Sequence, residues 1–146
     1  MNGRDFLEVA NDLLASPREA AWRSAVSRAY YAAFHVARDL LGDLGFRVPR
    51  GDQAHAYLWM RLSNCGDPQI QVAGQKLHDL RSERNRADYD LAPPLSRTAA
   101  TSQARVAEHI IQSLGAGWVE PARTQITDAM RNYERTVLRA VTWQPP

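Results

Sequence analysis

Apolar residues recur at helical spacing along almost the whole chain, and this pattern limits the folds open to it. The clearest case is the stretch from residue 17 to residue 41, where apolar side chains follow one another at intervals of three and four: Val26, Tyr30, Ala33, Phe34, Ala37 and Leu41. Side chains with this spacing share one face of an α-helix. No alternating run of Val, Ile and Thr is long enough for a β-strand. The sequence therefore predicts an all-α protein.

Proline, glycine and capping residues divide the pattern into separate helices. Ser16 is expected to cap the second helix, which has Pro17 at its first position. Asp67 is expected to cap the fourth helix, which has Pro68 at its first position. Ser96 is expected to open a further helix. The expected helices cover residues 5–14, 17–41, 53–63, 68–90, 96–114 and 121–141.

The chain length fits a single domain. With 146 residues it lies in the range in which one hydrophobic core is usual. We expect a helical bundle over residues 1–117 and a C-terminal helical extension and tail over 118–146 within the same domain. The last apolar stripe (Ile126, Met130, Tyr133, Val137 and Val141) is expected to pack on the core, and residues 143–146 are expected to be frayed.

Charge and composition narrow the classes of function. The net charge is +2, and Lys76 is the one lysine among 18 basic residues. Arginine presents a planar fork that suits phosphate, so an RNA-binding surface is permitted, although the small net charge does not require one. Cys65 stands alone and excludes an intrachain disulfide or a cysteine-based zinc site. No metal or cofactor is expected, because the sequence has no HExxH motif and no Gly-rich phosphate loop. No apolar run reaches the roughly 18 residues of a membrane span, so we expect a cytoplasmic protein without membrane contact.

Two rows of polar and aromatic side chains stand out on the long helices. On the helix expected over 17–41, Arg28, Tyr31, His35 and Arg38 form a stripe beside the apolar face. On the helix expected over 68–90, one side carries Ile70, Ala73, Leu77, Leu80, Ala87 and Leu91, and another carries His78, Arg81, Asn85 and Tyr89, with Arg84 at the boundary. If the two helices pack together, the rows can meet in one groove and form a functional site.

Each row also has a purely structural explanation. Tyr31 and His35 would then lie at the edge of the core, flanked by solvated arginines. Arg84 and Asp88, four residues apart, would form an ordinary helix-surface ion pair, with Arg81 and Asn85 solvated. The spacing within each helix does not decide between the two explanations.

These two helices resemble a known family. The segments SRAYYAAFHVARDLL (27–41) and LRSERNRADYDL (80–91) look like the HEPN domain (higher eukaryotes and prokaryotes nucleotide-binding), in particular its small stand-alone prokaryotic branch with an Arg-Asn-Arg-Ala-Asp-Tyr motif. The resemblance covers about residues 5–115. It implies an up-down bundle of about five helices, here followed by a C-terminal helix. It also implies a homodimer, often encoded beside a small nucleotidyltransferase as a toxin and antitoxin pair.

The resemblance also implies a chemistry. In active members an Arg, usually followed by a polar residue such as Asn, and a His after four intervening positions form a metal-independent ribonuclease site across the dimer. Arg84 and Asn85 match the start of this motif, but Tyr89 occupies the position of the His. A tyrosine hydroxyl with a pKa near 10 is a far weaker general base at neutral pH than an imidazole with a pKa near 6.5. Some relatives carry a Tyr two positions further on, which the partner modifies with a nucleotide; that position is Leu91, and Tyr89 is the alternative acceptor.

The favoured interpretation is an RNA-directed protein of a toxin-antitoxin or defence module, either a ribonuclease or a degenerate RNA-binding relative. Arg84 would hold the phosphate, Asn85 would orient it, and Tyr89 would donate a hydrogen bond or stack on a base. The surrounding RNA-binding residues would be Arg28, Tyr31, His35, His78 and Arg81, with His35 or His78 as a substitute imidazole. The alternatives are a non-catalytic dimerisation or interaction module that partners a nucleotidyltransferase, and a nucleotide-binding regulator.

Overall fold

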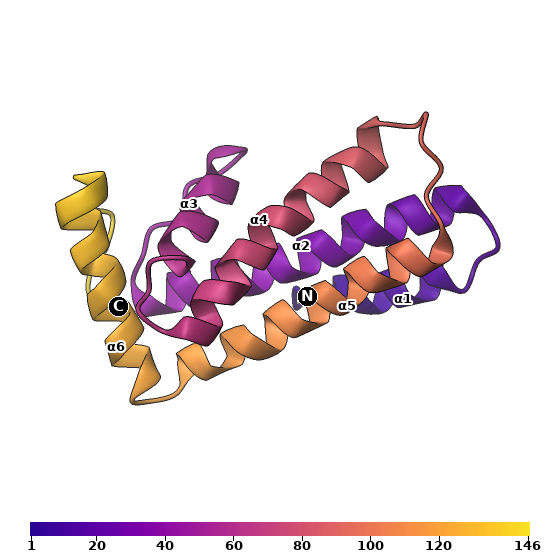
Figure 1. Ribbon diagram of the computed structural model, residues 1–146. Helices are drawn as coiled ribbons and strands as arrows, with labels where there is room; N and C mark the ends of the chain where they lie inside the picture. The colour runs from indigo at the N-terminus through magenta and orange to yellow at the C-terminus, as the bar shows by residue number, and fades with distance from the viewer.

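Six α-helices make up the protein in the computed structural model, which describes residues 1–146 (Figure 1). A 3-10 turn (Ala116–Trp118) precedes the last helix, and a π-helical segment (Glu134–Leu138) follows it. The helices are α1 (Asp5–Leu14), α2 (Glu19–Leu44), α3 (Gln53–Leu62), α4 (Pro68–Tyr89), α5 (Arg97–Gly115) and α6 (Ala122–Tyr133). The prediction of an all-α fold is confirmed.

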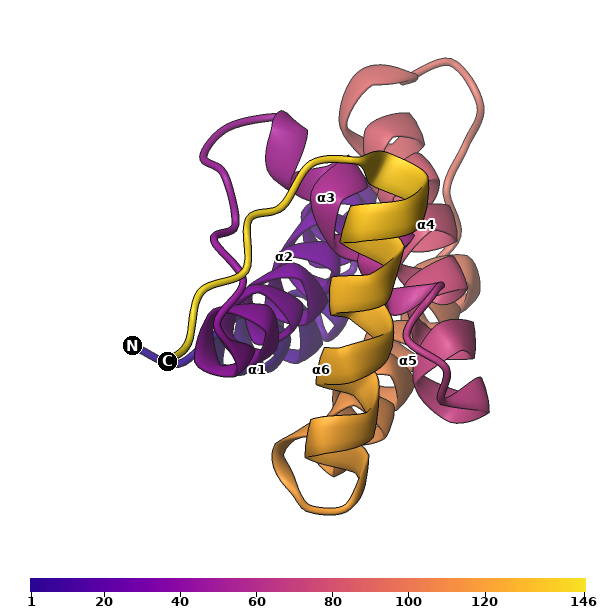
Figure 2. The same ribbon diagram turned by 90° about the vertical axis from the view of Figure 1, so that its left-hand side faces the viewer.

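Four of the helices run along the length of the molecule. In chain order α1, α2, α4 and α5 alternate in direction, which makes an up-down bundle (Figure 1). The short α3 lies against α2 and α4, and α6 crosses one end of the bundle (Figures 1 and 2). The two helices that carry the polar rows, α2 and α4, are therefore packing neighbours.

The apolar faces expected for α2 and α4 meet in the core. All six residues of the α2 face are buried, and so are Ile70, Ala73, Leu77, Leu80 and Ala87 of α4. Ile126 and Met130 of α6 belong to the same hydrophobic cluster as the core residues of α2 and α4. None of the helices combines the length and the hydropathy that a membrane crossing requires.

The helix starts agree with the capping residues in two of three cases. The carboxylate of Asp67 accepts hydrogen bonds from the backbone N–H of Gln69 and Ile70, and the hydroxyl of Ser96 accepts one from Ala99. The predicted start at Ser16 and Pro17 is wrong, because α2 begins at Glu19. The carbonyl of Ser16 accepts a hydrogen bond from the indole of Trp22 at 2.7 Å, which holds this loop outside the helix.

Trp143 and Gln144 are held against the bundle, so the prediction of a frayed tail is wrong for these two residues. Gly45 ends α2 in the left-handed region with φ of 105°, and its carbonyl accepts a hydrogen bond from the N–H of Gln144 at 2.9 Å. The indole of Trp143 donates to the carbonyl of Leu44 at 2.8 Å. In Figure 2 the tail runs back from α6 beside the loop between α2 and α3.

Two expected apolar faces end earlier than the sequence pattern indicated. The last α-helix stops at Tyr133, and Arg139 takes a left-handed conformation with φ of 52°, which turns the chain back. Val137 and Val141 are exposed for this reason. Leu91 is also exposed, because α4 ends at Tyr89 and Asp90 is extended before the two prolines.

Candidate functional site

Arg84 lies at the centre of a small cluster on α2 and α4, which we call the Arg84 cluster: Ser27, Tyr31, Arg84, Asn85, Asp88 and Tyr89. The side chain of Arg84 is only 15% exposed, and its Nε lies 2.9 Å from Oδ2 of Asp88. The geometry at Nε does not give a hydrogen bond, so the attraction is chiefly one of charge. The expected ion pair between Arg84 and Asp88 is therefore present.

Two further polar contacts hold the cluster in place. One Nη of Arg84 donates to Oδ1 of Asn85 at 3.0 Å. The hydroxyl of Ser27, on α2, donates to Oδ2 of Asp88 at 3.1 Å. Asp88 thus connects the two helices while it balances the charge of Arg84. The guanidinium is held in place, and its positive charge is balanced by the carboxylate of Asp88.

Aromatic rings flank the guanidinium of Arg84. Its Cζ lies 5.1 Å from the ring centre of Tyr31 and 5.7 Å from that of Tyr89. Both distances are within the range of cation–π attraction. Tyr31 is half-buried on α2, whereas Tyr89 is 75% exposed at the end of α4. Of the two residues of α2 expected to meet this part of α4, Tyr31 does so through its contact with Arg84.

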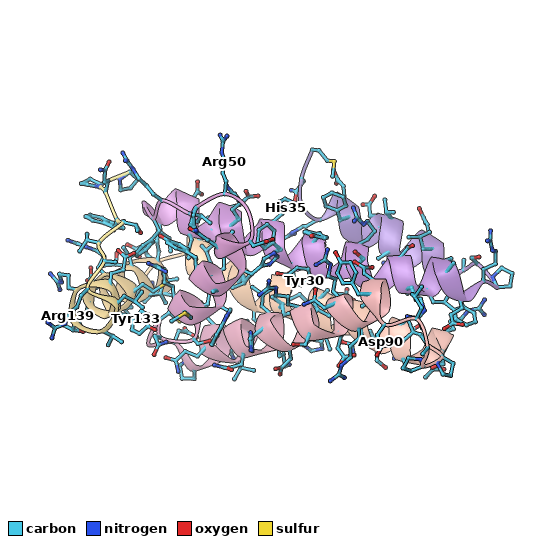
Figure 3. The ribbon with its side chains drawn as sticks, turned by 90° about the horizontal axis from the view of Figure 1, so that it is seen from above. Tyr30, His35, Arg50, Asp90, Tyr133 and Arg139 are labelled. Carbon is cyan, nitrogen blue, oxygen red and sulfur yellow. The ribbon has the colours of Figure 1, made fainter.

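His35 belongs to a different contact. Its ring stacks on that of Phe6 from α1, with 5.5 Å between the centres and 17° between the planes. Burial lowers the pKa of His35, which favours the neutral imidazole. Arg28 covers both Phe6 and Tyr31, at 5.2 Å and 5.3 Å from the ring centres. In Figure 3, His35 is further from α4 than Tyr30 is. The structure thus places His35 at the packing of α1 on α2.

His78 is covered as well. Its ring packs on the indole of Trp59 from α3 with 4.2 Å between the centres, and its Nδ1 is enclosed without a hydrogen-bond partner in the protein. Arg81, one turn further along α4, is half-buried and makes no hydrogen bond or ion pair with the protein. Along the row on α4, His78 is therefore packed against α3, Arg81 is unpaired and Tyr89 is exposed.

The sequence interpretation missed an imidazole at this place. His55, on α3, is buried and its Nδ1 is hydrogen-bonded to the hydroxyl of Tyr30 on α2. Burial lowers the pKa of His55, and the positive charges of Arg81 and Arg84 lower it further. Burial also raises the pKa of Tyr30. Figure 3 shows Tyr30 between the ribbons of α2 and α4. The one sequence signal for His55 is its place in the apolar stretch AHAYLW (54–59), which predicts a buried polar residue.

Nowhere in the chain do three His, Cys, Asp or Glu side chains come together in an arrangement that holds a metal ion. The chemistry that the site offers is instead that of guanidinium, imidazole, hydroxyl and aromatic groups at the junction of α2, α3 and α4. This combination suits an anionic, aromatic ligand such as a nucleotide or RNA.

The fold and this site define a class of protein: an up-down helical bundle with an arginine and aromatic site between two neighbouring helices. Comparison with family models gives a match to the HEPN domain over residues 2–118. The chain belongs to the HEPN family, as its two motifs indicated. No curated protein and no solved structure matches it. The matched region ends at the 3-10 turn, so α6 and the tail lie outside it.

Proposed function

We propose that this HEPN protein binds RNA at the Arg84 cluster and belongs to a two-gene toxin-antitoxin or defence module. The observation that carries the proposal is the position of the Arg84 guanidinium between Tyr31 and the exposed ring of Tyr89. Surfaces that bind single-stranded RNA combine cationic groups with aromatic rings on which the bases stack. Family membership supports RNA as the ligand.

The roles of the residues follow from their exposure. Tyr89 offers a ring face to an unstacked base, and Asn85 orients the guanidinium of Arg84 through the 3.0 Å hydrogen bond. A tyrosine hydroxyl in place of the family imidazole is a poor general base at neutral pH. RNA binding is therefore better supported than cleavage by the family mechanism.

Loss of the Tyr89 ring should weaken RNA binding. Stacking of one base on an aromatic side chain contributes about 1–3 kcal/mol, so we expect Tyr89→Ala to raise the Kd by roughly 5- to 150-fold. Tyr89→Phe keeps the ring and should bind nearly as well as the wild type. The measurement is fluorescence anisotropy with a labelled single-stranded RNA at fixed low salt. Tyr133→Ala is the matched control, because Tyr133 is at the α6 end of the molecule (Figure 3).

The same preparations test for cleavage. Purified protein is incubated with total RNA and transfer RNA in the presence of a chelator, alongside Arg84→Ala. Chelator-resistant cleavage that the Arg84→Ala variant lacks would make the protein a ribonuclease that tolerates Tyr89. Absence of cleavage together with RNA affinity would leave a binding protein. A wild type with no affinity for RNA at low salt would refute the proposal.

A second candidate function is supported by a separate observation. Leu91 is 69% exposed and lies two residues after Tyr89, so an exposed leucine and an exposed tyrosine are close together in the chain at the end of α4. Such a surface suits an interaction module that binds a second copy of the chain or a nucleotidyltransferase partner.

Leu91→Lys tests this second candidate. If the surface joins two copies, the wild type should sediment as a dimer and Leu91→Lys should shift it to the monomer. Val137→Lys, at an equally exposed valine beyond α6, is the control and should leave the mass unchanged. If the wild type is a monomer, the surface at Leu91 does not join two copies, and a different protein chain would have to be its partner. Co-expression with a neighbouring nucleotidyltransferase then shows whether Leu91→Lys prevents co-purification.

A further inference from the structure

Arg81 is a cation at the junction of α2, α3 and α4 that has no hydrogen-bond or ion-pair partner. It is half-buried on α4, its Nε is enclosed, and no oxygen of the protein accepts a hydrogen bond from its guanidinium. An enclosed donor that lacks an acceptor destabilises the folded protein. Native proteins keep few such groups, and each calls for an explanation, of which a bound ion or ligand is one. The neighbouring Arg84, by contrast, has Asp88 and Asn85 as partners.

His55 presents a second donor at the same place. The Tyr30 hydroxyl has Nδ1 of His55 as its hydrogen-bond partner. Burial keeps Tyr30 protonated by raising its pKa, and it keeps His55 neutral by lowering its pKa. The Tyr30 hydroxyl has no other acceptor in the protein, so we assign it as the donor to Nδ1, and the neutral imidazole then carries its proton on Nε2. Nε2 has no hydrogen-bond partner in the protein and is not among the enclosed atoms, so it is a free donor.

The two donors lie on helices that pack together, because α3, which carries His55, contacts both α4, which carries Arg81, and α2. Arg81 is the cation with the strongest electrostatic effect on both His55 and Tyr30, and Arg84 comes second. Asp88 balances the charge of Arg84, and no acidic side chain is paired with Arg81. The junction of α2, α3 and α4 therefore carries an uncompensated positive charge and a neutral N–H donor.

We propose that Arg81 and the Nε2–H of His55 form an oxyanion subsite for a phosphate group, and that Arg84, held by Asp88, acts as a stacking surface between Tyr31 and Tyr89. The proposal reverses the roles expected from the sequence, in which Arg84 holds the phosphate. The subsite itself rests on the hydrogen bond of His55 with Tyr30, on the enclosed and unpartnered Nε of Arg81 and on the packing of α3 against α4; that its phosphate belongs to RNA rests on the proposed function.

Phosphate is the oxyanion favoured by the surroundings. A guanidinium fork fits both carboxylate and phosphate, but the rings of Tyr31 and Tyr89 lie on either side of the adjacent Arg84. Aromatic faces next to an oxyanion subsite are what a nucleotide requires, because its base can stack while its phosphate is bound. The phosphate can come from an RNA backbone or from a free ion, and the experiment has one arm for each.

The first arm uses inorganic phosphate and does not depend on RNA. Isotope-labelled protein is titrated with phosphate while the imidazole resonances of His55 and His109 are followed by NMR. We expect a saturable shift for His55 and none for His109, which is exposed on α5. Arg81→Gln should abolish the shift, and Arg81→Lys should retain part of it. Arg105→Ala, which removes an exposed and unpaired charge from α5, should have no effect.

The second arm measures the salt dependence of RNA binding for the same variants. Each phosphate contact contributes about 0.7–1 to the slope of log Kd against log salt concentration. Arg81→Gln should reduce the slope by this amount. Arg84→Ala should weaken binding with nearly the wild-type slope, because Asp88 already balances its charge. Backbone amide spectra of each variant confirm that it is folded.

The outcomes separate this inference from the proposed function. A His55 response without RNA affinity would support the subsite and refute RNA as its ligand. The subsite would be refuted if the salt dependence of RNA binding changes in Arg84→Ala but not in Arg81→Gln and phosphate does not shift the His55 resonance. The proposed function would then still stand. A phosphate shift of His55 that persists in Arg81→Gln would also refute the subsite.

Discussion

Replacing Glu134 by alanine should lower the free energy of unfolding by about 3–5 kcal/mol, the cost of leaving one member of a buried ion pair alone. Glu134 is fully buried, and its Oε2 lies 2.8 Å from an Nη of Arg61, which is itself only 6% exposed. The same carboxylate accepts hydrogen bonds from the backbone of Thr142 at 3.0 Å and of Trp143 at 3.1 Å. The substitution removes all of these contacts and strands the charge of Arg61. Urea unfolding followed by circular dichroism measures the effect.

A control variant that also removes one negative charge shows whether the loss of stability comes from the buried contacts of Glu134 or from the loss of any acidic group. Asp128→Ala removes an exposed carboxylate from α6 and should change stability by less than about 0.5 kcal/mol. The tail should also loosen in Glu134→Ala, so that the indole of Trp143 becomes accessible to a fluorescence quencher. Equal stabilities of the two variants, or an unchanged Trp143, would contradict the assignment of Glu134 as the group that holds the tail.

The Glu134 contribution should depend on pH in one direction. Burial alone would raise the pKa of Glu134, but the hydrogen bonds from Thr142 and Arg61 and the charge of Arg61 outweigh it, so the pKa lies below 4.5. A lowered folded-state pKa adds stability above the unfolded-state value, and this stability is lost as the pH falls through the folded-state pKa. The stability difference between wild type and Glu134→Ala should therefore be full at neutral pH and shrink below pH 4.5. A difference that grows in acid would contradict this.

Arg23→Met should destabilise the protein by about 2–3 kcal/mol, because hydrogen bonds of charged donors contribute more than neutral ones. The guanidinium of Arg23 donates to the carbonyls of Ala87 at 3.0 Å, Asp90 at 2.9 Å and Pro93 at 2.6 Å. It also pairs with Glu19 at 3.1 Å. Arg23 thus ties the end of α4 and the following loop to α2. Amide hydrogen exchange between residues 86 and 95 should accelerate along with the drop in stability.

Arg86→Met is the control for Arg23. Arg86 lies on α4 and pairs with Glu83 at 3.1 Å, but its side chain is 71% exposed. Exposed pairs contribute at most about 1 kcal/mol. If the two variants unfold at the same denaturant concentration, or if exchange at the end of α4 stays slow in Arg23→Met, then Arg23 does not anchor this segment. Because Tyr89 is the last residue of α4, Arg23→Met should also weaken RNA binding if the proposed function is correct.

Much of the fold could be predicted because helix formation depends on neighbours in the chain. The spacing of Val26, Tyr30 and Phe34 predicted a buried face that the structure confirms. The predicted cap at Asp67 is also confirmed, since a cap involves residues only two or three positions apart. The start of α2 was mispredicted because Ser16 makes contacts with Trp22 and with Arg97, which is 81 positions away.

The same distinction applies to the candidate site: contacts within one helix could be predicted, and contacts between helices could not. The ion pair of Arg84 with Asp88 lies within one helix, so its four-residue spacing was enough to predict it. The position of His55 beside Tyr30 depends on how α3 packs on α2, and no spacing within either helix contains that information. The order of the tail was missed for a similar reason, because the Leu44 carbonyl that holds Trp143 is 99 positions away.

The amino-acid sequence by itself determined the helical character, the buried faces, most helix ends and membership of the HEPN family, because these depend on residues close together in the chain or on motifs within one helix. The tertiary structure decided which polar groups on different helices meet. It placed the ring of Tyr31 beside Arg84, left Arg81 without a partner, brought His55 to the site and folded the tail onto Glu134. The physical reason is that a charge is neutralised or left free by the groups that packing brings within a few ångströms of it, whatever their separation along the chain.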